Sequence, residues 1–322
     1  MGTILAVAEL ARYQDGPACV VISSDGADLV FRTDYHQGGR SNVTESRMRV
    51  ADFVTRGEGP WPWYDLGPRR TGALQVLAAL GVEPPAWTEA LRPDVLDLFR
   101  RAQRGDSAVI ELLAMGADPD PVDACGASPL WYAVRSPGSG IAVALIDAGA
   151  DAGRRIDLSA RGERYTTILH EIVREGRTVA LNHALVNGAP PMLIDSDGAT
   201  PMHVVGGDGD NVNPEIVRAL ARAGAAVDAA MPDGTQPVDR ATRLLLPRTV
   251  AALVELGADP ARGLDTLLTW WVTAAVRFDA HKAGAAAEVA EVLRAGGARV
   301  TERHRELAAS AGAEQVIAAL RH

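Results

Sequence analysis

Apolar residues recur with helical spacing over most of the chain, but near its start the pattern favours strands. Residues 18–23 and 29–35 are rich in β-branched and aromatic side chains, and a Ser-Asp-Gly turn at 24–26 separates them, which predicts a two-stranded hairpin. Residues 47–54 are the candidate for a third strand, and residues 71–80 have the pattern of a helix. This part of the chain therefore predicts a small α/β or β-rich unit.

One type of helix ending recurs through the rest of the chain. An apolar helical stretch is closed by a Gly-Ala pair six times, and in five of the six a Leu stands four residues before the Gly. Glycine accepts the positive φ with which a chain leaves a helix, and a Leu one turn earlier can pack inward. The six glycines are Gly116, Gly149, Gly188, Gly224, Gly257 and Gly297.

A second signal recurs between these endings: a Gly-containing turn that leads into a helix start. Ser or Thr directly before Pro is typical of such a start, because the hydroxyl can cap the helix and Pro already has a helical φ. Asp-Gly supplies a tight turn just before. The four helix starts are Ser128–Trp131, Thr167–His170, Thr200–His203 and Gln236–Asp239.

Turn, capped short helix, second helix and a period near 33 residues together resemble the ankyrin repeat, whose hallmark is Thr-Pro-Leu-His followed later by Gly-Ala-Asp. The resemblance covers residues 93–322. Trp131 and Asp239 depart from it where the tetrad has His, and Gln236 departs where it has Thr. It implies a mostly α fold, an ankyrin-repeat solenoid of about six repeats with helical caps.

The resemblance also implies a division of the chain. Residues 1–68 form the small N-terminal unit, residues 69–92 are a linker and helix, and the repeat array follows with a C-terminal cap at 301–320. The array opens with a helix pair at 95–104 and 108–115. Near its end, residues 267–278 and 288–293 supply the two helices of a diverged repeat without a Pro start.

In the ankyrin family the turn tips and the first helices of a solenoid form a concave surface that generally binds another protein. The resemblance therefore implies a protein partner and no cofactor. Trp131 is expected to pack inside. Candidate contact positions, transferred turn by turn, are Cys125, Ala127, Tyr132, Arg135, Glu163, Arg164, Thr166, Arg174, Ser196, Asp197, Asp208, Asp233, Thr235 and Arg243.

Charge narrows the class of partner. The chain has 41 acidic and 32 basic residues, a net charge of -9, which disfavours nucleic acid and favours a neutral or basic protein.

No apolar run reaches the roughly 18 residues of a membrane span, and residues 1–10 lack the basic segment of a signal peptide. Two cysteines form neither a disulfide framework nor a metal site, so we expect a cytoplasmic protein. Of the 32 lysine and arginine residues, only Lys282 is a lysine, which indicates a bacterial, GC-rich genome.

Two segments contain residue types that could carry chemistry. Residues 170–174 match most of the His-Glu-x-x-His zinc helix, but Arg174 stands where the second His is required. Residues 208–215 are rich in oxygen ligands, yet Val212 interrupts the ligand spacing of a calcium loop. We therefore predict no catalytic residue and no metal site, and interpret the chain as an adaptor or inhibitor, with an immunity-type inhibitor of a basic enzyme as a narrower variant. The alternative is an enzymatic or ligand-binding N-terminal domain that the array targets.

Overall fold

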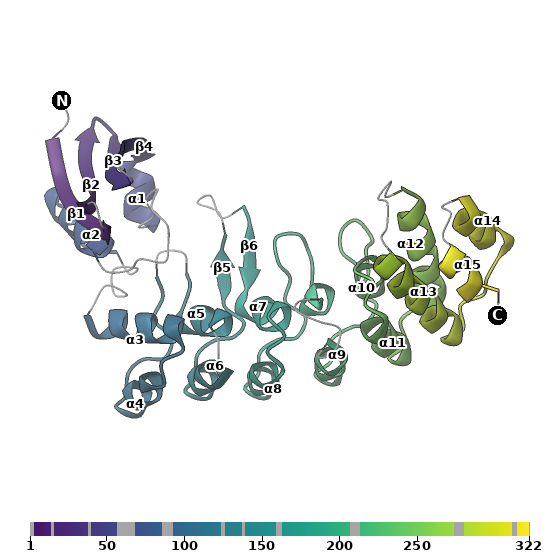
Figure 1. The fold of residues 1–322 in the computed structure, drawn as a ribbon. Helices are drawn as coiled ribbons and strands as arrows, with labels where there is room; N and C mark the ends of the chain where they lie inside the picture. The colour runs from purple at the N-terminus through teal and green to yellow at the C-terminus, as the bar shows by residue number, and fades with distance from the viewer. Residues whose placement is uncertain are drawn as a thin grey trace. The chain divides into compact units, whose positions relative to one another are not determined.

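The computed structural model shows a mostly helical protein with a small antiparallel sheet (Figure 1). It divides into two compact units, the first comprising Met1–Ala150 with Arg155–Glu163 and the second Asp151–Arg154 with Arg164–His322. The structure describes residues 3–13, 16–37, 40–56, 68–85, 93–123, 126–136, 139–158, 163–206, 213–273, 280–310 and 314–321.

The first unit begins with a four-stranded meander. Strands pair antiparallel in the order β1-β2-β3-β4. The predicted hairpin is confirmed, with Asp25 opposite Asp28 at its turn and Ile22 opposite Phe31 further along. An additional strand, β1, precedes it, which the sequence analysis did not predict. The strands are β1 (Thr3–Tyr13), β2 (Gly16–Asp25), β3 (Asp28–Gln37) and β4 (Arg40–Arg49).

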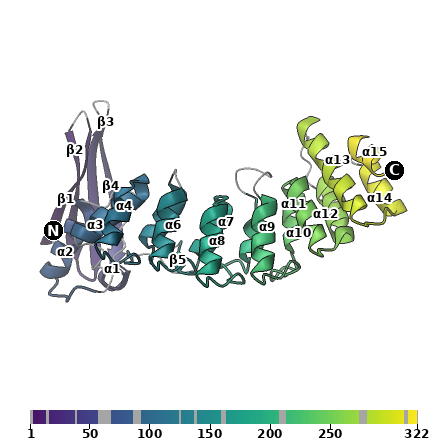
Figure 2. The same cartoon turned by 90° about the horizontal axis from the view of Figure 1, so that it is seen from below.

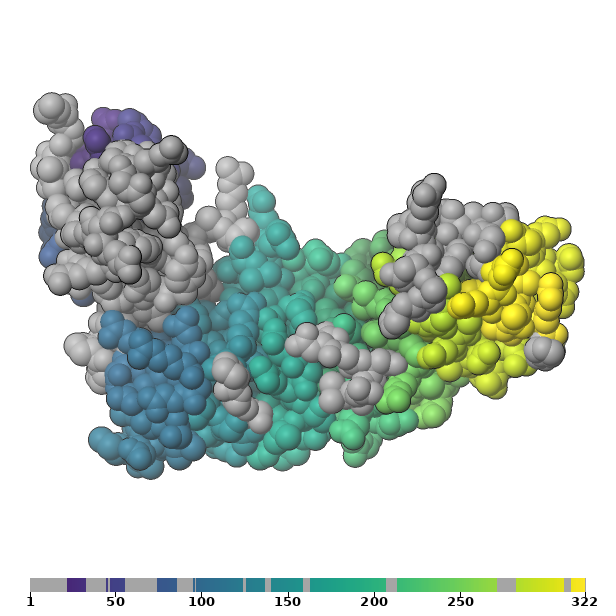
Figure 3. Space-filling view, in the orientation of Figure 1, coloured from purple at the N-terminus to yellow at the C-terminus, as the bar shows by residue number. Residues whose placement is uncertain are grey.

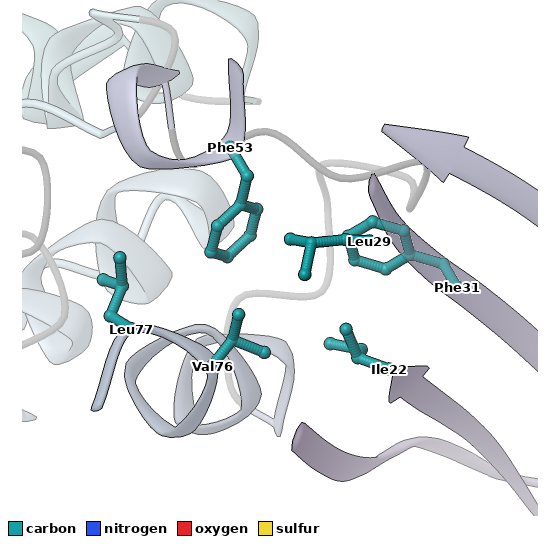
Figure 4. Packing of buried hydrophobic residues seen from close by; sticks show 6 residues of the cluster. All are labelled: Ile22, Leu29, Phe31, Phe53, Val76 and Leu77. Carbon is teal, nitrogen blue, oxygen red and sulfur yellow. The ribbon is translucent and has the colours of Figure 1, made fainter. Parts of the chain in front are cut away.

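Two helices cover one face of this sheet, α1 (Val50–Arg56) and α2 (Pro68–Ala79). The helix predicted at 71–80 is confirmed, but the third strand predicted at 47–54 is only half right, because the chain turns into α1 at Val50. Phe53 of α1 lies against Phe31 of β3, with ring centroids 6.3 Å apart, so α1 folds back over the sheet. Figure 4 shows the buried cluster, which comprises Ile22, Leu29, Phe31, Phe53, Val76 and Leu77.

Two further helix pairs and a short strand complete the first unit. Helix α3 packs on α4 and α5, and α6 packs on α4 and α5. The predicted opening helix pair is therefore confirmed as α3 and α4, and Trp131 on α5 is buried as expected. These elements are α3 (Pro93–Arg104), α4 (Ala108–Ala114), α5 (Pro129–Arg135), α6 (Ser139–Asp147) and β5 (Arg155–Asp157).

Helices of the second unit form two rows (Figures 1 and 2). Contacts run along α7, η2, α10, α12 and α14 in one row and along α8, α9, α11, α13 and α15 in the other. In the space-filling view the second unit is coloured from teal through green to yellow (Figure 3). The elements are β6 (Tyr165–Thr167), α7 (Ile168–Arg174), α8 (Thr178–Val186), η2 (Pro201–Val204), α9 (Asn213–Arg222), α10 (Pro237–Arg243), α11 (Pro247–Glu255), α12 (Pro260–Thr273), α13 (Ala280–Ala295), α14 (Glu302–Ser310) and α15 (Glu314–Ala319).

All six Gly-Ala endings have the predicted geometry. Their glycines have φ between 88° and 105°. In each, the alanine N–H donates to the carbonyl five residues earlier at 2.9–3.0 Å, and the glycine N–H donates to the carbonyl three residues earlier, which is the Schellman motif. Leu145, Leu220, Leu253 and Leu293, one turn before four of these glycines, are buried, and Leu112 is half-buried.

The last part of the chain differs from its predicted boundaries. Helix α12 does start with a proline, Pro260, seven residues before the predicted start at 267, and α13 begins at Ala280. The predicted C-terminal cap consists of two helices, α14 and α15. Among the described residues no helix has the length and apolar character needed to cross a membrane.

Candidate functional site

Three turns with the same hydrogen bonds lead into the short helices α5, η2 and α10. They span residues 123–127, 195–199 and 231–235. In each, the first residue donates its N–H to the carbonyl four residues on, at 2.9–3.0 Å, and the glycine N–H returns to the carbonyl of the first residue. An aspartate carboxylate accepts further backbone N–H groups inside each turn. These turns are therefore held by their own backbone before any packing is added.

His170 connects one turn-helix segment to the next. Its Nδ1 lies 2.8 Å from the Thr167 hydroxyl, and its Nε2 lies 2.9 Å from the carbonyl oxygen of Ala199. Because a carbonyl can only accept, Nε2 carries the hydrogen and the Thr167 hydroxyl donates to Nδ1. Burial lowers the pKa of His170, which keeps the ring neutral. This residue is a structural histidine, as the tetrad pattern predicts.

His203 makes the equivalent two contacts at the next helix start, Thr200–His203. The Thr200 N–H donates to Nδ1 at 3.1 Å, so the hydrogen is on Nε2, which lies 3.2 Å from the carbonyl oxygen of Thr235. Burial again lowers the pKa of the imidazole. Each histidine thus joins its own helix start to the residue directly before the next helix start.

Asp239 is the fourth residue of the helix start Gln236–Asp239, the position that His170 and His203 hold in theirs. Its carboxylate can accept hydrogen bonds but cannot donate them. Its Oδ2 accepts from the N–H of Gln236 at 2.8 Å and from Nε of Arg262 at 2.7 Å, while Oδ1 accepts from the Thr266 hydroxyl at 2.6 Å. The carboxylate is 2% exposed, whereas the Arg262 side chain is 38% exposed. Helix α12 therefore supplies the donors that a histidine would carry itself.

A further helix start with a histidine at its fourth residue, Thr301–His304, was missed by the sequence analysis. The Thr301 N–H donates to Nδ1 of His304 at 3.2 Å, and Nε2 of His304 donates to the Asp265 carboxylate at 2.9 Å. His304 is buried. Threonine followed by His three residues later, the spacing of Thr167–His170, could have identified it in the sequence.

The predicted contact residues fall into three classes of exposure. Thr166, Thr235 and Ala127 are buried, so their side chains are not exposed on the surface of this structure. Tyr132 and Ser196 are half-buried. Cys125 and Asp208 lie outside the described residues. The exposed residues are Arg135, Glu163, Arg164, Arg174, Asp197, Asp233 and Arg243.

Thr166 and Thr235 are buried because each stands just before a helix start. Thr166 lies in the middle of β6, where only the side chain before it, Tyr165, is partly exposed. Thr235 donates its N–H to the Asp233 carboxylate, and its carbonyl receives the hydrogen bond of His203. Matching turn positions identified the turn correctly but not the direction of these side chains.

Three exposed arginines have the same position in their helices. Arg135, Arg174 and Arg243 are each the last residue of a seven-residue helix. The Arg135 guanidinium lies 3.8 Å above the ring of Trp131, and Arg174 donates to the buried carboxylate of Glu171. These contacts restrict the arginines without covering them.

Tyr132 has internal partners. Its hydroxyl donates to the Asp123 carboxylate at 2.6 Å, and its ring meets Phe99 edge-on at 5.7 Å. The side chain therefore braces the 123–127 turn against α3.

The turn-tip carboxylates are held in place. At Asp233 the hydrogen bond from the Thr235 N–H lowers the pKa of the carboxyl group, and Arg243 adds to this effect. Asp197 is exposed at the equivalent part of the preceding turn. Turn tips thus present carboxylates, and the ends of the first helices present guanidinium groups.

Metal-ligand chemistry has little support in the part of the chain that the structure describes. No group of three or more His, Cys, Asp or Glu side chains there could hold a metal ion. Both ring nitrogens of His170 are engaged in hydrogen bonds. Residues 207–212, which include most of the acidic loop considered above, lie outside the described residues.

Comparison with protein-family models and with curated proteins finds no match for this chain. The function must therefore be argued from the repeated geometry and the exposed charges.

Proposed function

We propose that this protein is an ankyrin-type repeat protein that binds another protein, as an adaptor or inhibitor rather than as an enzyme. The observation that carries the proposal is the recurrence of one unit: turn, helix start, short first helix, second helix and Schellman ending. Such units stack into a solenoid and hold their turn tips on a common side. This recurrence favours the ankyrin resemblance over an unrelated helical fold.

The exposed charges favour the turn tips and first helices as the binding surface. Tip carboxylates such as Asp197 and Asp233 are exposed, and arginines at the helix ends carry the opposite sign. On the second-row helices, Arg218 of α9 is paired with Glu255 of α11 at 2.8 Å. A surface with fixed charges of both signs suits a specific protein partner.

The net charge of -9 favours a neutral or basic partner over nucleic acid. We also place the protein in the cytoplasm, because its two cysteines are far apart in the sequence and provide no disulfide framework.

The test is affinity capture with the full chain from lysate of the source organism. Wild type is compared with a variant that combines Arg135→Ala, Arg174→Ala and Arg243→Ala. A matched control carries Arg218→Ala, Arg222→Ala and Arg248→Ala, which removes three exposed arginines from the second-row helices α9 and α11. Unfolding curves must show that both variants are folded.

We expect one partner to be retained by wild type and by the control variant, and lost from the variant that lacks Arg135, Arg174 and Arg243. Equal capture by all three proteins would contradict the assignment of the binding surface. A captured partner that is released only by changes within residues 1–56 would instead favour the N-terminal sheet as the functional part.

A further inference from the structure

The row of turns in the second unit ends early. Fourteen residues separate α8 from η2 and α9 from α10, and each of these links contains a turn of the type described above. Only four residues, 256–259, separate α11 from α12. The 231–235 turn therefore has a neighbouring turn on one side, and no turn follows it in the link before α12.

Neighbouring turns meet at one position, two residues before the helix start. At Tyr165 the carbonyl accepts from the N–H of Ser196 in the next turn, at 3.0 Å. At Gly198 the next turn places Pro232 so close that a Cβ on the glycine would lie 2.5 Å from Pro232 Cδ. Both positions are thus covered by the turn that follows in the sequence.

Gly234 is the equivalent position in the last turn, and it is open. Its φ of 81° matches the 78° of Gly198, so the two turns present the same backbone surface. A Cβ built on Gly234 would meet no atom of the described residues within 4 Å, in contrast to Gly198. Within the described part of the chain, nothing fills the place beside Gly234 that the next turn would take.

Arg262 partly substitutes for the missing turn. One of its terminal nitrogens donates to the Gly234 carbonyl, the atom equivalent to the Tyr165 carbonyl that receives the Ser196 N–H. The same guanidinium neutralises Asp239. Its other terminal nitrogen, Nη1, makes no hydrogen bond to a described residue, so the two N–H groups of Nη1 are not used within the described part of the chain.

We propose that this open place beside Gly234 and Arg262 receives an extended, proline-containing segment of the partner protein, which takes the position of the missing turn. The proposal rests on the proposed protein-binding function. Within the same molecule, the ring of Pro232 packs on Gly198, whose backbone conformation matches that of Gly234. A proline ring suits such a place because it is rigid and because proline has no backbone N–H that needs an acceptor. A backbone carbonyl of the incoming segment would accept from Nη1 of Arg262, which adds a polar contact to the packing.

The chain's own turn is the probe. A capped peptide with the sequence of residues 229–236 is titrated into the isotope-labelled full chain, and the amide signals of Gly234 and Thr235 and the Nε signal of Arg262 are followed by NMR. We expect saturable shifts at these three groups with a dissociation constant of about 1 mM, as is reasonable for a short unlinked segment. Arg262→Gln should weaken the peptide roughly tenfold, the loss of about 1.4 kcal/mol.

Two controls decide the result. A peptide with Pro232→Asp should bind at least tenfold more weakly, since the charge cannot pack on Gly234. In a grafted chain, residues 226–235 are inserted after Ala258 so that a turn fills the place in cis, and the free peptide should no longer shift Gly234. No shift at Gly234 up to about 5 mM peptide, or equal shifts in the grafted chain, would overturn the proposal.

This experiment uses only the chain and a peptide, so its outcome is independent of the capture experiment. Loss of the peptide effect with intact capture would remove the docking place but not the proposed function. Peptide binding without any captured partner would show the reverse.

Discussion

Residues 167–176 and 236–245 are two versions of one ten-residue segment. Each has a capping residue, a seven-residue helix that ends in arginine, and a tenth residue with left-handed backbone, Gly176 with φ 64° in one and Leu245 with φ 56° in the other. They differ at the fourth residue, where His170 stands in the first segment and Asp239 in the second.

The difference shows two ways of joining a helix start to the structure that follows it: the donor of the hydrogen bond lies on the fourth residue itself or on its partner. His170 is both acceptor and donor, so it completes the link with its own ring and needs only a carbonyl from the next turn. Asp239 offers only acceptors, so the donors come from Arg262 and Thr266 on α12. A histidine link needs only a backbone carbonyl from the next turn, whereas the aspartate link depends on the side chains of two residues of α12.

The largest effect should come from breaking the aspartate link. Asp239→Ala leaves the Gln236 N–H, the Thr266 hydroxyl and the Arg262 guanidinium without their shared acceptor, and we expect a loss of about 3 kcal/mol in the free energy of unfolding. Denaturant unfolding measures it, with Asp228→Ala as the exposed control, expected to change stability by less than about 0.5 kcal/mol.

A double variant sharpens this result. Asp239→His combined with Arg262→Gln replaces the buried carboxylate with a neutral ring whose Nδ1 can accept from the Gln236 N–H, and it should recover part of the lost stability. If the double variant is no more stable than Asp239→Ala, the two links are not interchangeable and the comparison fails.

Removing the histidine link should cost less. His170→Ala deletes a buried ring and leaves the Ala199 carbonyl and the Thr167 hydroxyl without their partner, so we expect about 2 kcal/mol of destabilisation. His183→Ala on α8 is the control, since His183 is only half-buried. Equal losses in the two variants would show that the link through His170 adds nothing beyond ordinary burial.

Acid should act on the histidine links. Burial lowers the pKa of His170 and of His203 in the folded protein. Above about pH 6.5 both rings are neutral in both states and add no pH dependence, whereas at lower pH the unfolded chain takes up protons that the folded rings refuse. Stability should therefore fall as the pH drops below about 6.5, by up to about 1.4 kcal/mol per pH unit for each excluded proton.

Urea unfolding between about pH 7.5 and about pH 5 tests this dependence. A variant with His170→Gln and His203→Gln should show a shallower pH dependence than wild type. An unchanged slope would assign the acid sensitivity to other groups and remove the distinction between the two kinds of link.

Local signals explain how much of the helical part the sequence predicts. The six Gly-Ala endings are predictable because positive φ is a property of the glycine itself and the Schellman bonds are confined to six residues. The helix starts are equally local, although Pro260 was overlooked as the start of α12.

The N-terminal unit is harder because its elements depend on contacts across the sheet. Strand β1 has register shifts between Ile4 and Ala6 and between Glu9 and Ala11, which break the alternation that identifies a strand. Residues 50–54 include Val50 and Val54, which favour a strand locally, but Phe53 packs on Phe31 only from a helix.

The candidate surface shows the same limit. The turn pattern predicts the tip residues Asp197 and Asp233, because Asp-Gly favours a tight turn, and both residues are exposed. Arg262 could not be found this way, since its importance depends on a turn that is missing from the chain and on an aspartate at 239. Contacts between residues far apart in the sequence can be found only in the folded structure.

The smallest expected effect concerns the tenth residue of the two segments. Leu245 is the one described non-glycine residue with positive φ, at a position where the first segment has Gly176. Leu245→Gly should relieve the left-handed strain and stabilise the chain by about 0.5 kcal/mol, since the loss of a half-buried side chain offsets part of the gain. Gly176→Leu should destabilise by about 1 kcal/mol for the same reason with the opposite sign. Thermal unfolding of both variants measures the pair. A destabilised Leu245→Gly variant would show that packing of the Leu245 side chain, rather than backbone strain, governs this position.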